Sequence, residues 1–524
     1  MGFGSTKKIW NYKVKNISPK SALVSLSDKT NLDLLVSFLV EKNVEIISTG
    51  GTYKAIKEIT DNVIEVSEYT GHKEMMDGRV KTLHPKIHAG ILARRGEDTD
   101  VLKSMGYKEI DIVVVNLYPF EETIKSGCSF EEAIEQIDIG GPTMIRAAAK
   151  NFKDVLVLSN PNDYEEMISE WDSKSGISYE FRKKQAAKVF KKMSQYNRAI
   201  HQYIDSENDE NIIMDLSNPK VLRYGENPHQ KAKLYLKDSS QKKNIANADI
   251  LQGKELSYNN IADSDAAWEC LKQFQKPACV IVKHANPCGV SESDDIGTAY
   301  RKAFQTDPTS AFGGIIAINR ALESSLAEEI LENQFVEVII APKFDIDALN
   351  VLKKKENIRV LRCDLDGDAV GNQFKVVSGG VLVQDEDTKI ISIDDLKVVS
   401  DLKPSQNQLD DFMFAWKVAK FVKSNAIVFA KDGQTIGIGA GQMSRVISAE
   451  IASLKAKEEG LNVEGSCMAS DAFFPFRDGI DKAASSGIKS IIQPGGSVRD
   501  QEVIDAANEH KMVMVFTGVR HFRH

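Results

Sequence analysis

The chain has 524 residues, more than one hydrophobic core usually serves, so two to four domains are expected. Hydrophobic residues make up 42% and charged residues 27%, which is ordinary for a globular protein and excludes wholesale disorder. The formal net charge of -8 repels nucleic acid and anionic membranes, so neither is an expected partner, and an anionic substrate requires a local basic pocket.

Neither the cysteines nor the apolar segments indicate an oxidising compartment or a membrane. The six cysteines are scattered without a CxxC pair, as expected where thiols stay reduced. No stretch approaches the ~20 apolar residues that cross a bilayer, and the lysines near the N-terminus precede no signal-type apolar run. We therefore expect a cytoplasmic protein.

The first third of the chain alternates between strand-like and helix-like segments. Residues 22–26 and 44–47 are short apolar runs, and residues 31–40 between them have apolar side chains at helical spacing. Residues 110–117 are apolar almost throughout, as in a parallel strand buried on both faces, and residues 155–158 fit a further strand. This alternation predicts a doubly wound α/β sheet.

A domain boundary is predicted near residue 215. Apolar side chains from Phe181 to Tyr203 recur at helical spacing in a lysine-rich segment, which predicts one long amphipathic helix. Acidic and polar residues follow at 206–211, and a run that contains Pro and Gly opens the next section at 218–230. We therefore predict an N-terminal extension of unknown role at 1–20, a first domain at 21–215 and a second domain at 216–524.

The second section contains a weak internal repeat. ACVIVK at 278–283 is followed by SAFG at 310–313, and AIVFAK at 426–431 is followed by DAFF at 471–474. Two structurally related halves produce such a pattern, although short apolar strands also resemble each other by chance.

Two polar loops of the first domain carry groups that bind a nucleotide phosphate. Ser27, Lys29 and Thr30 follow the first predicted strand, and residues 48–52, with two glycines, follow the next. Gly-rich turns and helix N-termini favour anions, and open α/β sheets bind ligands at this edge. A helix cap or a tight turn explains either loop alone, but the two together favour a phosphate site.

Further charged and polar groups lie in predicted loops of the same domain. Residues 79–86 hold an arginine, two lysines and a histidine without helical amphipathicity, and Asp138 lies in a turn before a predicted helix at 144–150. Tyr118 follows the strand at 110–117. A solvated loop would explain residues 79–86, a helix cap would explain Asp138, and a core aromatic would explain Tyr118. The functional alternative is that these residues form a group of cations and proton carriers at the carboxyl edge of the sheet.

The densest motif of the second domain is KHANPCG at 283–289, directly after a predicted strand. A lone histidine is usually a core or surface group, but His284 beside Lys283 offers a general base and a cation. GIGAG at 437–441 lacks the GxGxxG spacing and a surrounding βαβ unit, so no dinucleotide cofactor is predicted.

A zinc-dependent nucleobase deaminase is the alternative enzyme class. Such enzymes carry HxE followed by PCxxC. Cys288 follows a proline, but no Glu stands two residues after His284, and Ser291 occupies the second cysteine position. No catalytic metal is therefore predicted.

Eight long motifs in order, between Ser21 and His524, closely resemble the bienzyme family that combines AICAR formyltransferase with IMP cyclohydrolase. The motifs are SDKT, RVKTLHP, NLYPF, IDIGGPTMIRAAAKN, RYGENPHQ, KHANPCG, SNAIVFAKDGQTIGIGAGQMSR and DAFFPFRD. The resemblance implies formyl transfer from the co-substrate 10-formyltetrahydrofolate to the 5-amino group of AICAR, followed by closure of formyl-AICAR to IMP with loss of water. It implies AICAR, formyl-AICAR, IMP and folate as partners, and a homodimer.

The resemblance also implies a fold for each domain. The N-terminal domain is similar to methylglyoxal synthase, a doubly wound parallel sheet, and is expected to perform cyclohydrolysis. The C-terminal domain resembles two duplicated cytidine-deaminase-like α/β units without zinc, and is expected to transfer the formyl group.

Positions of this chain that match the family's functional residues fall into two sets. For cyclohydrolysis, the resemblance implies catalytic Lys81, Tyr118, Asp138 and Lys150, and nucleotide-binding Ser27, Lys29, Ser48, Gly51, Thr52, Arg79 and Thr82. For formyl transfer, it implies catalytic Lys283, His284 and Asn425, and substrate-binding Arg223, Tyr224, Phe312, Gly313, Glu337, Ser444, Arg445, Phe473, Asp478 and Arg520. The terminal TGVRHFRH departs most from the family's pattern.

A nucleotide-binding regulatory protein that kept the folds and lost the chemistry is the alternative outside the enzymes. Such a protein is expected to have lost Lys81, Asp138 or His284. All three are present, which favours an enzyme.

Overall fold

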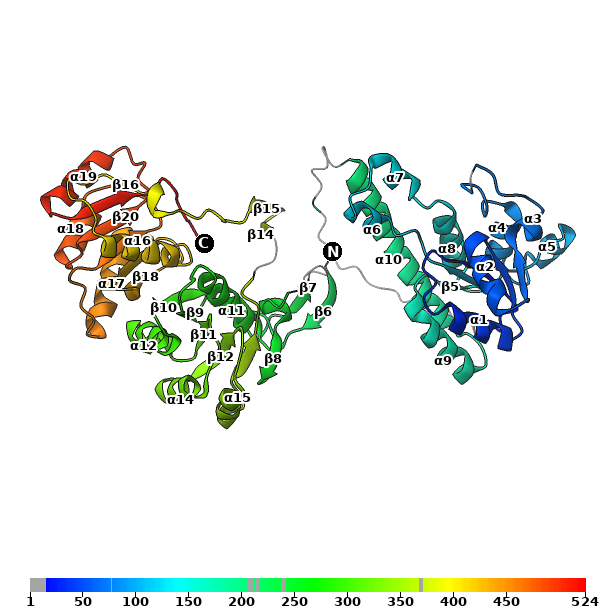
Figure 1. Cartoon of the computed structure of the whole chain (residues 1–524), viewed down its shortest axis with the longest axis horizontal. Helices are drawn as coiled ribbons and strands as arrows, with labels where there is room; N and C mark the ends of the chain where they lie inside the picture. The colour runs from blue at the N-terminus through cyan, green and yellow to red at the C-terminus, as the bar shows by residue number, and fades with distance from the viewer. Residues whose placement is uncertain (1–15, 77, 206–211, 213–215, 237–241, 367–370) are drawn as a thin grey trace. The chain divides into compact units, whose positions relative to one another are not determined.

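The computed structural model describes residues 16–76, 78–205, 212, 216–236, 242–366 and 371–524 (Figure 1). The chain divides into two compact units, Met1–Ile212 and Ile213–His524. The first unit has two hydrophobic cores and the second has three, so each unit has a buried interior of its own.

A five-stranded parallel sheet forms the centre of the first unit, in the order β3-β2-β1-β4-β5. Its strands are β1 (Ser21–Ser25), β2 (Glu45–Ser48), β3 (Val63–Glu65), β4 (Ile112–Val115) and β5 (Leu156–Leu158). The predicted doubly wound parallel sheet is confirmed. The apolar run at 110–117 contributes only four residues to β4, because residues 116–118 leave the sheet at its carboxyl edge.

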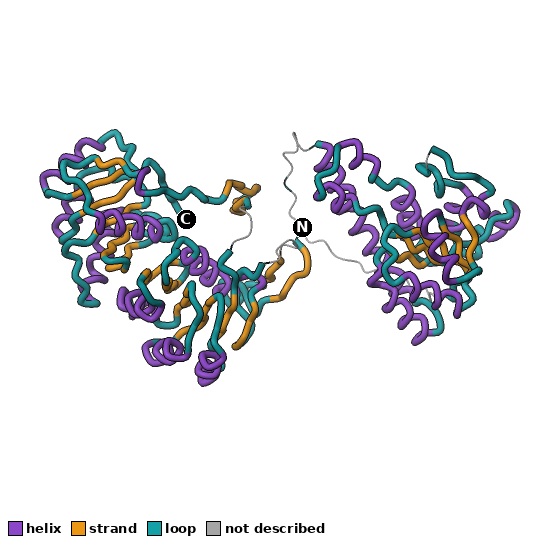
Figure 2. The backbone as a smooth tube through the Cα atoms, viewed as in Figure 1, coloured by secondary structure: helices purple, strands orange, loops and turns teal. Residues whose placement is uncertain are grey.

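Helices cover both faces of this sheet (Figure 2). Ala22 and Val24 pack with α1 and α9 on one face, whereas Leu23 packs with α4, α8 and α10 on the other, which explains why the strands are apolar throughout. The helices of this unit are α1 (Leu32–Glu41), α2 (Gly50–Ile59), α3 (Val66–Thr70), α4 (Pro85–Leu92), α5 (Thr99–Ser104), α6 (Phe120–Lys125), α7 (Phe130–Glu135), α8 (Gly140–Lys150), η1 (Pro161–Asp163), α9 (Tyr164–Lys174) and α10 (Tyr179–Ile204).

Helix α10 confirms the long amphipathic helix predicted between Phe181 and Tyr203. It runs for 26 residues, and the Ser178 side chain caps its start by accepting a hydrogen bond from the backbone NH of Phe181. Val189, Met193 and Tyr196 are buried on its inner face. This helix therefore packs against the sheet, and through Tyr196 it reaches the Asp138 loop described below.

A twelve-stranded mixed sheet runs through the second unit, in the order β16-β21-β20-β19-β17-β18-β10-β9-β11-β12-β13-β8. Its first half contains β8 (Asp249–Gln252), β9 (Ala278–Lys283), β10 (Asn286–Glu292), β11 (Gly314–Ile318), β12 (Val336–Ala341) and β13 (Arg359–Arg362). Its second half contains β16 (Lys397–Val398), β17 (Ile427–Lys431), β18 (Gln434–Gly439), β19 (Cys467–Ser470), β20 (Ser490–Gln493) and β21 (Val513–Phe516). The halves meet where β10 pairs antiparallel with β18.

The two halves have the same topology, which confirms the duplication. In each half, an antiparallel hairpin (β9–β10 or β17–β18) is joined by one antiparallel strand and then by two parallel strands, with an antiparallel strand at the outer edge. The helices are η2 (Ile245–Asn247), α11 (Tyr258–Leu271), α12 (Ile296–Thr306), α13 (Pro308–Ala311), α14 (Ser324–Asn333), α15 (Ile346–Leu352) and η3 (Lys353–Lys355), then η4 (Ile393–Asp395), α16 (Gln406–Ala419), α17 (Arg445–Glu458), α18 (Asp478–Ser485) and α19 (Asp500–Glu509).

Only part of the repeat predicted from the sequence occupies equivalent positions in the two halves. ACVIVK and AIVFAK form the equivalent strands β9 and β17. SAFG and DAFF are not equivalent, because SAFG precedes β11 whereas DAFF follows β19. The residue equivalent to Asp471 is Asn319: each follows its strand directly, and their backbone NH groups donate to Ala426 and Ala278 respectively.

Two further hairpins complete the second unit. Strand β6 (Ser217–Val221) pairs with β7 (Lys233–Leu236), and β14 (Asn372–Val377) pairs with β15 (Gly380–Asp385). The β14–β15 hairpin lies between the two halves in the sequence, and its apolar side chains Val376, Val381 and Leu382 are exposed.

Candidate functional site

The carboxyl edge of the first sheet brings together loops that are distant in the sequence. Strand order reverses between β1 and β4, and open α/β sheets bind ligands in the crevice at such a reversal. Ser27 follows β1, and Asn116 and Tyr118 follow β4. The loop of Ser27 and Lys29 and the NLYPF motif therefore meet at the expected ligand position.

Asn116 fastens these two loops together. Its Oδ1 accepts hydrogen bonds from the backbone NH groups of Ser27 at 2.6 Å and Asp28 at 3.1 Å, and its Nδ2 donates to the carbonyl of Asp28 at 2.6 Å. The Ser27 hydroxyl donates to Leu117 O at 2.7 Å. Asn116 is not among the predicted site residues, although a polar side chain at the end of an apolar strand is a signal for it.

The loop after β2 offers backbone rather than hydroxyl groups. Ser48 is buried and donates its hydroxyl to Val24 O at 2.7 Å. Thr52 Oγ1 accepts from the Leu26 NH at 2.9 Å and donates to Leu26 O at 3.0 Å. Ser48 thus connects β2 to β1, and Thr52 connects the first turn of α2 to the residue directly after β1. Gly51 is exposed in that first turn, where helix NH groups favour an anion.

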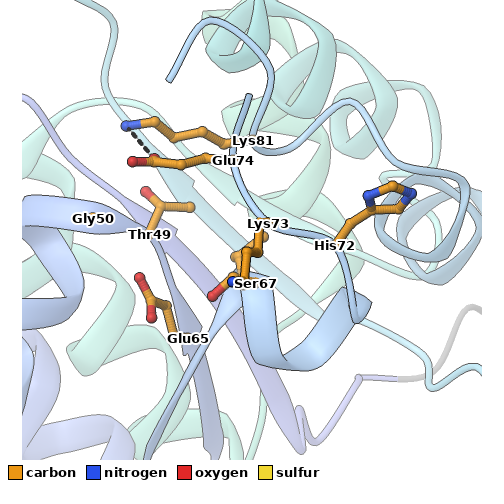
Figure 3. Close-up of a pocket in the computed structure, with 9 residues that line it drawn as sticks. Thr49, Gly50, Glu65, Ser67, His72, Lys73, Glu74 and Lys81 are labelled. Atoms are coloured by element: carbon orange, nitrogen blue, oxygen red, sulfur yellow. Dashed lines mark ion pairs between the residues drawn. The ribbon is translucent and has the colours of Figure 1, made fainter. Parts of the chain in front are cut away.

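A pocket of about 270 Å³ opens beside the N-terminus of α2 (Figure 3). Lys81 Nζ lies 3.2 Å from Glu74 Oε2, and a Cβ added at Gly50 would lie 3.6 Å from the same ammonium. The ion pair is partly exposed, so a bound anion can replace Glu74 as the partner of Lys81. The lining residues are Thr49, Gly50, Glu65, Val66, Ser67, His72, Lys73, Glu74 and Lys81.

Asp138 lies in the turn that leads into α8. Its backbone NH donates to Tyr196 Oη at 2.8 Å, and its Oδ1 accepts from the Gly141 NH at 2.8 Å. Burial raises the pKa of the Asp138 carboxyl, although the backbone NH groups of Gly141, Tyr118 and Gly140 favour its charged form. Asp138 thus stabilises the first turn of α8, as the helix-cap explanation predicts. Its raised pKa also suits proton transfer.

The raised pKa of Asp138 predicts a change in stability. Because the folded-state pKa lies above the unfolded value, the wild-type protein loses stability as pH rises through that folded pKa. In Asp138→Asn the side chain still accepts from Gly141 but does not ionise, so we expect a higher unfolding temperature at neutral pH and weaker cyclohydrolysis. Thermal unfolding followed from acidic to neutral pH checks this. Identical pH dependence in both proteins would contradict it.

The structure does not bring every predicted residue of the first unit to the pocket. Lys150 is exposed at the last residue of α8, ~15 Å along the helix from its start beside Asp138. Arg79 forms an ion pair with Glu135. Thr82 is buried near the start of α8, where a Cβ added at Gly140 would lie 2.8 Å from its Oγ1.

In the second unit, the KHANPCG motif forms the two-residue turn between β9 and β10. His284 and Ala285 are its central residues, and both have left-handed backbone conformations, with φ of 51° and 57°. Lys283 Nζ donates to Phe312 O and Gly313 O, both at 2.9 Å, which leaves one of its three hydrogens for a ligand.

The second half of the sheet contributes to the same place. Asn286 Oδ1 accepts from the backbone NH of Lys423 at 3.0 Å, so the segment before β17 lies beside the His284 turn. Asn425 Nδ2 donates to Gln442 O at 2.9 Å, and Ser448 Oγ donates to Asn425 O at 2.8 Å. His284 and Asn425 are therefore presented by different halves at one end of the shared sheet.

Asp471 organises the neighbouring residues. Its carboxylate is fully buried, forms an ion pair with Arg445 at 3.2 Å and accepts a hydrogen bond from the Ser424 hydroxyl. Asp471 is not among the predicted site residues and enters the sequence pattern only as part of the DAFF repeat. A charged residue directly after an apolar run, next to a predicted aromatic contact at Phe473, was the signal that could have identified it.

The C-terminal tail closes against this cluster. His521 is buried, and its backbone NH donates to Asp471 O at 3.1 Å. The guanidinium groups of Arg520 and Arg445 lie 4.3 Å and 5.9 Å from the centre of the Phe522 ring. Arg520 and Arg445 thus both contact the Phe522 ring, and the role of Arg520 in the site stays a prediction.

The remaining predicted residues occupy less connected positions. Phe312 is exposed by 63% and packs on Phe335 with ring centres 5.5 Å apart, beside the carbonyl that holds Lys283. Glu337 Oε2 accepts from Asn260 at 2.8 Å, and the guanidinium of Arg223 lies over the Tyr224 ring. Ser444 is exposed before α17, Asp478 is exposed at the start of α18, and Phe473 is partly exposed.

Two observations concern metals and membranes. Among the residues that the structure describes, no three His, Cys, Asp or Glu side chains are grouped so as to hold a metal ion. Cys288 donates to Ile281 O, and burial raises the pKa of its thiol to about 12.

Within the same described ranges, no helix is long and apolar enough to span a bilayer.

Comparisons with known proteins match both units. A family model described as AICARFT/IMPCHase bienzyme matches residues 148–455, and a model described as MGS-like domain matches residues 32–143. A solved structure titled "Crystal structure of ForH" is 31% identical and covers 36% of this chain and 99% of that chain, with a TM-score of 0.32. Because the bienzyme model spans more than half of the chain, this protein belongs to the AICARFT/IMPCHase bienzyme family and is a purine-biosynthesis enzyme with both formyltransferase and IMP cyclohydrolase activities.

Proposed function

We propose that residues 21–215 carry the cyclohydrolase and residues 216–524 carry the formyltransferase, with 10-formyltetrahydrofolate as the formyl donor. The observation that carries this proposal is the separation of two polar clusters, each built within one compact unit. Lys81 and Asp138 belong to the first, and His284 and Asn425 belong to the second. The match of residues 32–143 to the MGS-like domain supports a distinct activity in the first unit.

In the proposed cyclohydrolase site, the carboxamide nitrogen of formyl-AICAR attacks the formyl carbon, and water leaves in a later step. Negative charge develops on the former carbonyl oxygen, and the Lys81 ammonium stabilises it. Asp138 and Tyr118 accept and return the protons. The N-terminus of α2 and the Ser27–Lys29 loop bind the phosphate.

In the proposed transferase site, the 5-amino group of AICAR is a weak nucleophile because its lone pair is delocalised into the imidazole ring and the carboxamide. The His284 imidazole takes the amine proton as the new C–N bond forms. The bond from the formyl carbon to the folate nitrogen then breaks, and the protonated His284 returns a proton to that nitrogen as it leaves. The remaining N–H groups of Lys283 and Asn425 stabilise the transient oxyanion.

Two features of the second unit support its proposed partners. The exposed Phe312 ring, next to the Lys283 contact, offers an aromatic surface on which the planar ring system of a folate can stack. The exposed apolar side chains of the β14–β15 hairpin support a homodimer, because isolated hairpins rarely leave such surface uncovered. We propose that this dimer works in the cytoplasm.

Separate expression tests the division of labour. Residues 1–215 alone are expected to convert formyl-AICAR to IMP without folate, because the Lys81 pocket and the Asp138 loop lie within the first unit. Residues 216–524 are expected to formylate AICAR without producing IMP. Absorbance assays on each purified fragment, with the full chain as control, give the result. A folded but inactive first fragment, together with IMP formation by the second, would reverse the assignment.

A further inference from the structure

The turn that presents His284 is unusual in composition. A two-residue hairpin turn with positive φ at both centres favours Asn and Gly, because most side chains resist the left-handed conformation. Here the two positions are His284 and Ala285; histidine adopts the left-handed region more readily than most side chains, but alanine has no such preference. Contacts outside the turn must therefore keep it in this conformation.

Asp263 supplies such a contact from α11. Its Oδ1 accepts a hydrogen bond from the backbone NH of Ala285 at 2.8 Å. Burial raises the pKa of the Asp263 carboxyl, while the NH groups of Ala285 and His284 and the nearby charge of Lys283 favour the ionised form. On the other side, Asn286 Nδ2 donates to the carbonyl of His284 at 3.3 Å. The histidine is thus held through its backbone.

The duplicated half contains the same arrangement without a histidine. Asp263 is the sixth residue of α11, and Asp411 is the sixth residue of α16. Asp411 Oδ1 accepts from the Gly433 NH at 3.4 Å, in the equivalent turn between β17 and β18. That turn has Asp432 and Gly433 at its centre, with φ of 51° and 66°, which is the composition the turn prefers.

The two lysines before these turns are also equivalent. Lys283 donates to carbonyls just before β11, and Lys431 donates to Glu464 O, just before β19, at 3.0 Å. The turn, its aspartate and its lysine are therefore features of the repeated unit. The first half differs in placing His284 at a position where the second half has Asp432.

We propose that Asp263 is a positioning residue for formyl transfer, which acts through His284 by fixing the backbone of its turn. This inference rests on the proposed function, in which the His284 imidazole is the base. Asp263 makes the shorter contact, in the turn whose residues are less suited to it, so its hydrogen bond matters more than that of Asp411.

Two substitutions separate position from charge in the full-length protein. Asp263→Asn keeps a hydrogen-bond acceptor in place without the charge, whereas Asp263→Glu keeps the charge and moves the acceptor by one methylene. Misplacing a catalytic group by about 1 Å can cost ~100-fold. We therefore expect Asp263→Glu to lower transferase kcat by ~10–100-fold with little change in the KM for AICAR, and Asp263→Asn to stay within ~3-fold of wild type.

Matched controls come from the other half and from the histidine itself. Asp411→Asn and Asp411→Glu are expected to keep wild-type kcat. Asp263→Glu combined with His284→Ala is expected to be no slower than His284→Ala alone, because Asp263 acts through that side chain. Transferase rates are measured with AICAR and 10-formyltetrahydrofolate, and thermal unfolding confirms that each variant is folded.

The outcomes distinguish this inference from the proposed function. If His284→Ala is slow but Asp263→Glu keeps wild-type kcat, or if Asp411→Glu is equally slow, Asp263 has no special role. A slow Asp263→Asn beside a normal Asp263→Glu would show that charge rather than position matters, and would also overturn the inference. If His284→Ala itself keeps wild-type turnover, the proposed base is wrong and the inference fails with it.

Discussion

In the His284→Ala protein, formyl transfer is expected to slow by ~10²–10⁴-fold, the usual loss when a general base is removed. The substrate amine is a poor nucleophile, so attack requires proton removal as the C–N bond forms. The turn between β9 and β10 holds no second imidazole that could replace His284 in place. Steady-state kinetics with AICAR and 10-formyltetrahydrofolate measure the loss.

Binding and the second activity provide the controls for this prediction. The affinity for AICAR is expected to change far less than kcat, because a base acts mainly in the transition state. Cyclohydrolysis of supplied formyl-AICAR is expected to be unchanged, since that site is proposed to lie in the other unit. A variant that keeps turnover but binds AICAR much more weakly would show that His284 holds the substrate, and another base would have to be found.

The strands and the duplication were predictable because a buried strand leaves a recognisable run of apolar residues in the sequence. A strand covered on both faces is apolar throughout, so residues 22–26, 44–47, 110–117 and 155–158 identified β1, β2, β4 and β5. The SAFG and DAFF match failed because a four-residue similarity does not specify which end of a strand it flanks. Topology rather than sequence pairs Asn319 with Asp471.

Which way a polar side chain points could not be predicted from the loops. Ser48 donates to a carbonyl within β1 and Thr52 to a carbonyl directly after it, so their hydroxyl groups help to build the site rather than line it. Lys283 uses two of its hydrogens on carbonyls about 30 residues later in the chain. Asn116 and Asp263 could not be predicted because they act by accepting hydrogen bonds from backbone NH groups that are distant in sequence.

The position of Lys81 predicts the larger effect in the first unit. Its ammonium faces the start of α2 and forms an ion pair with the exposed side chain of Glu74, which a charged ligand can replace. Removing one donor to a developing oxyanion typically costs ~2.7–4 kcal/mol, which corresponds to ~10²–10³-fold in rate. Lys81→Ala is therefore expected to reduce cyclohydrolysis by this factor, measured as IMP formation from supplied formyl-AICAR.

Other cations of the same unit show whether the effect is specific to that position. Lys57 lies on α2 in an exposed ion pair with Asp61, and Lys57→Ala is expected to keep the wild-type rate. Lys150→Ala removes a charge at the far end of α8, so we expect a smaller loss than for Lys81→Ala. Formyl transfer is expected to be unaffected in all three variants. A folded Lys81→Ala protein with wild-type cyclohydrolysis would remove Lys81 from the mechanism. An equal loss in Lys150→Ala would require the two lysines to act at one site, although Lys150 lies at the far end of α8 from Asp138.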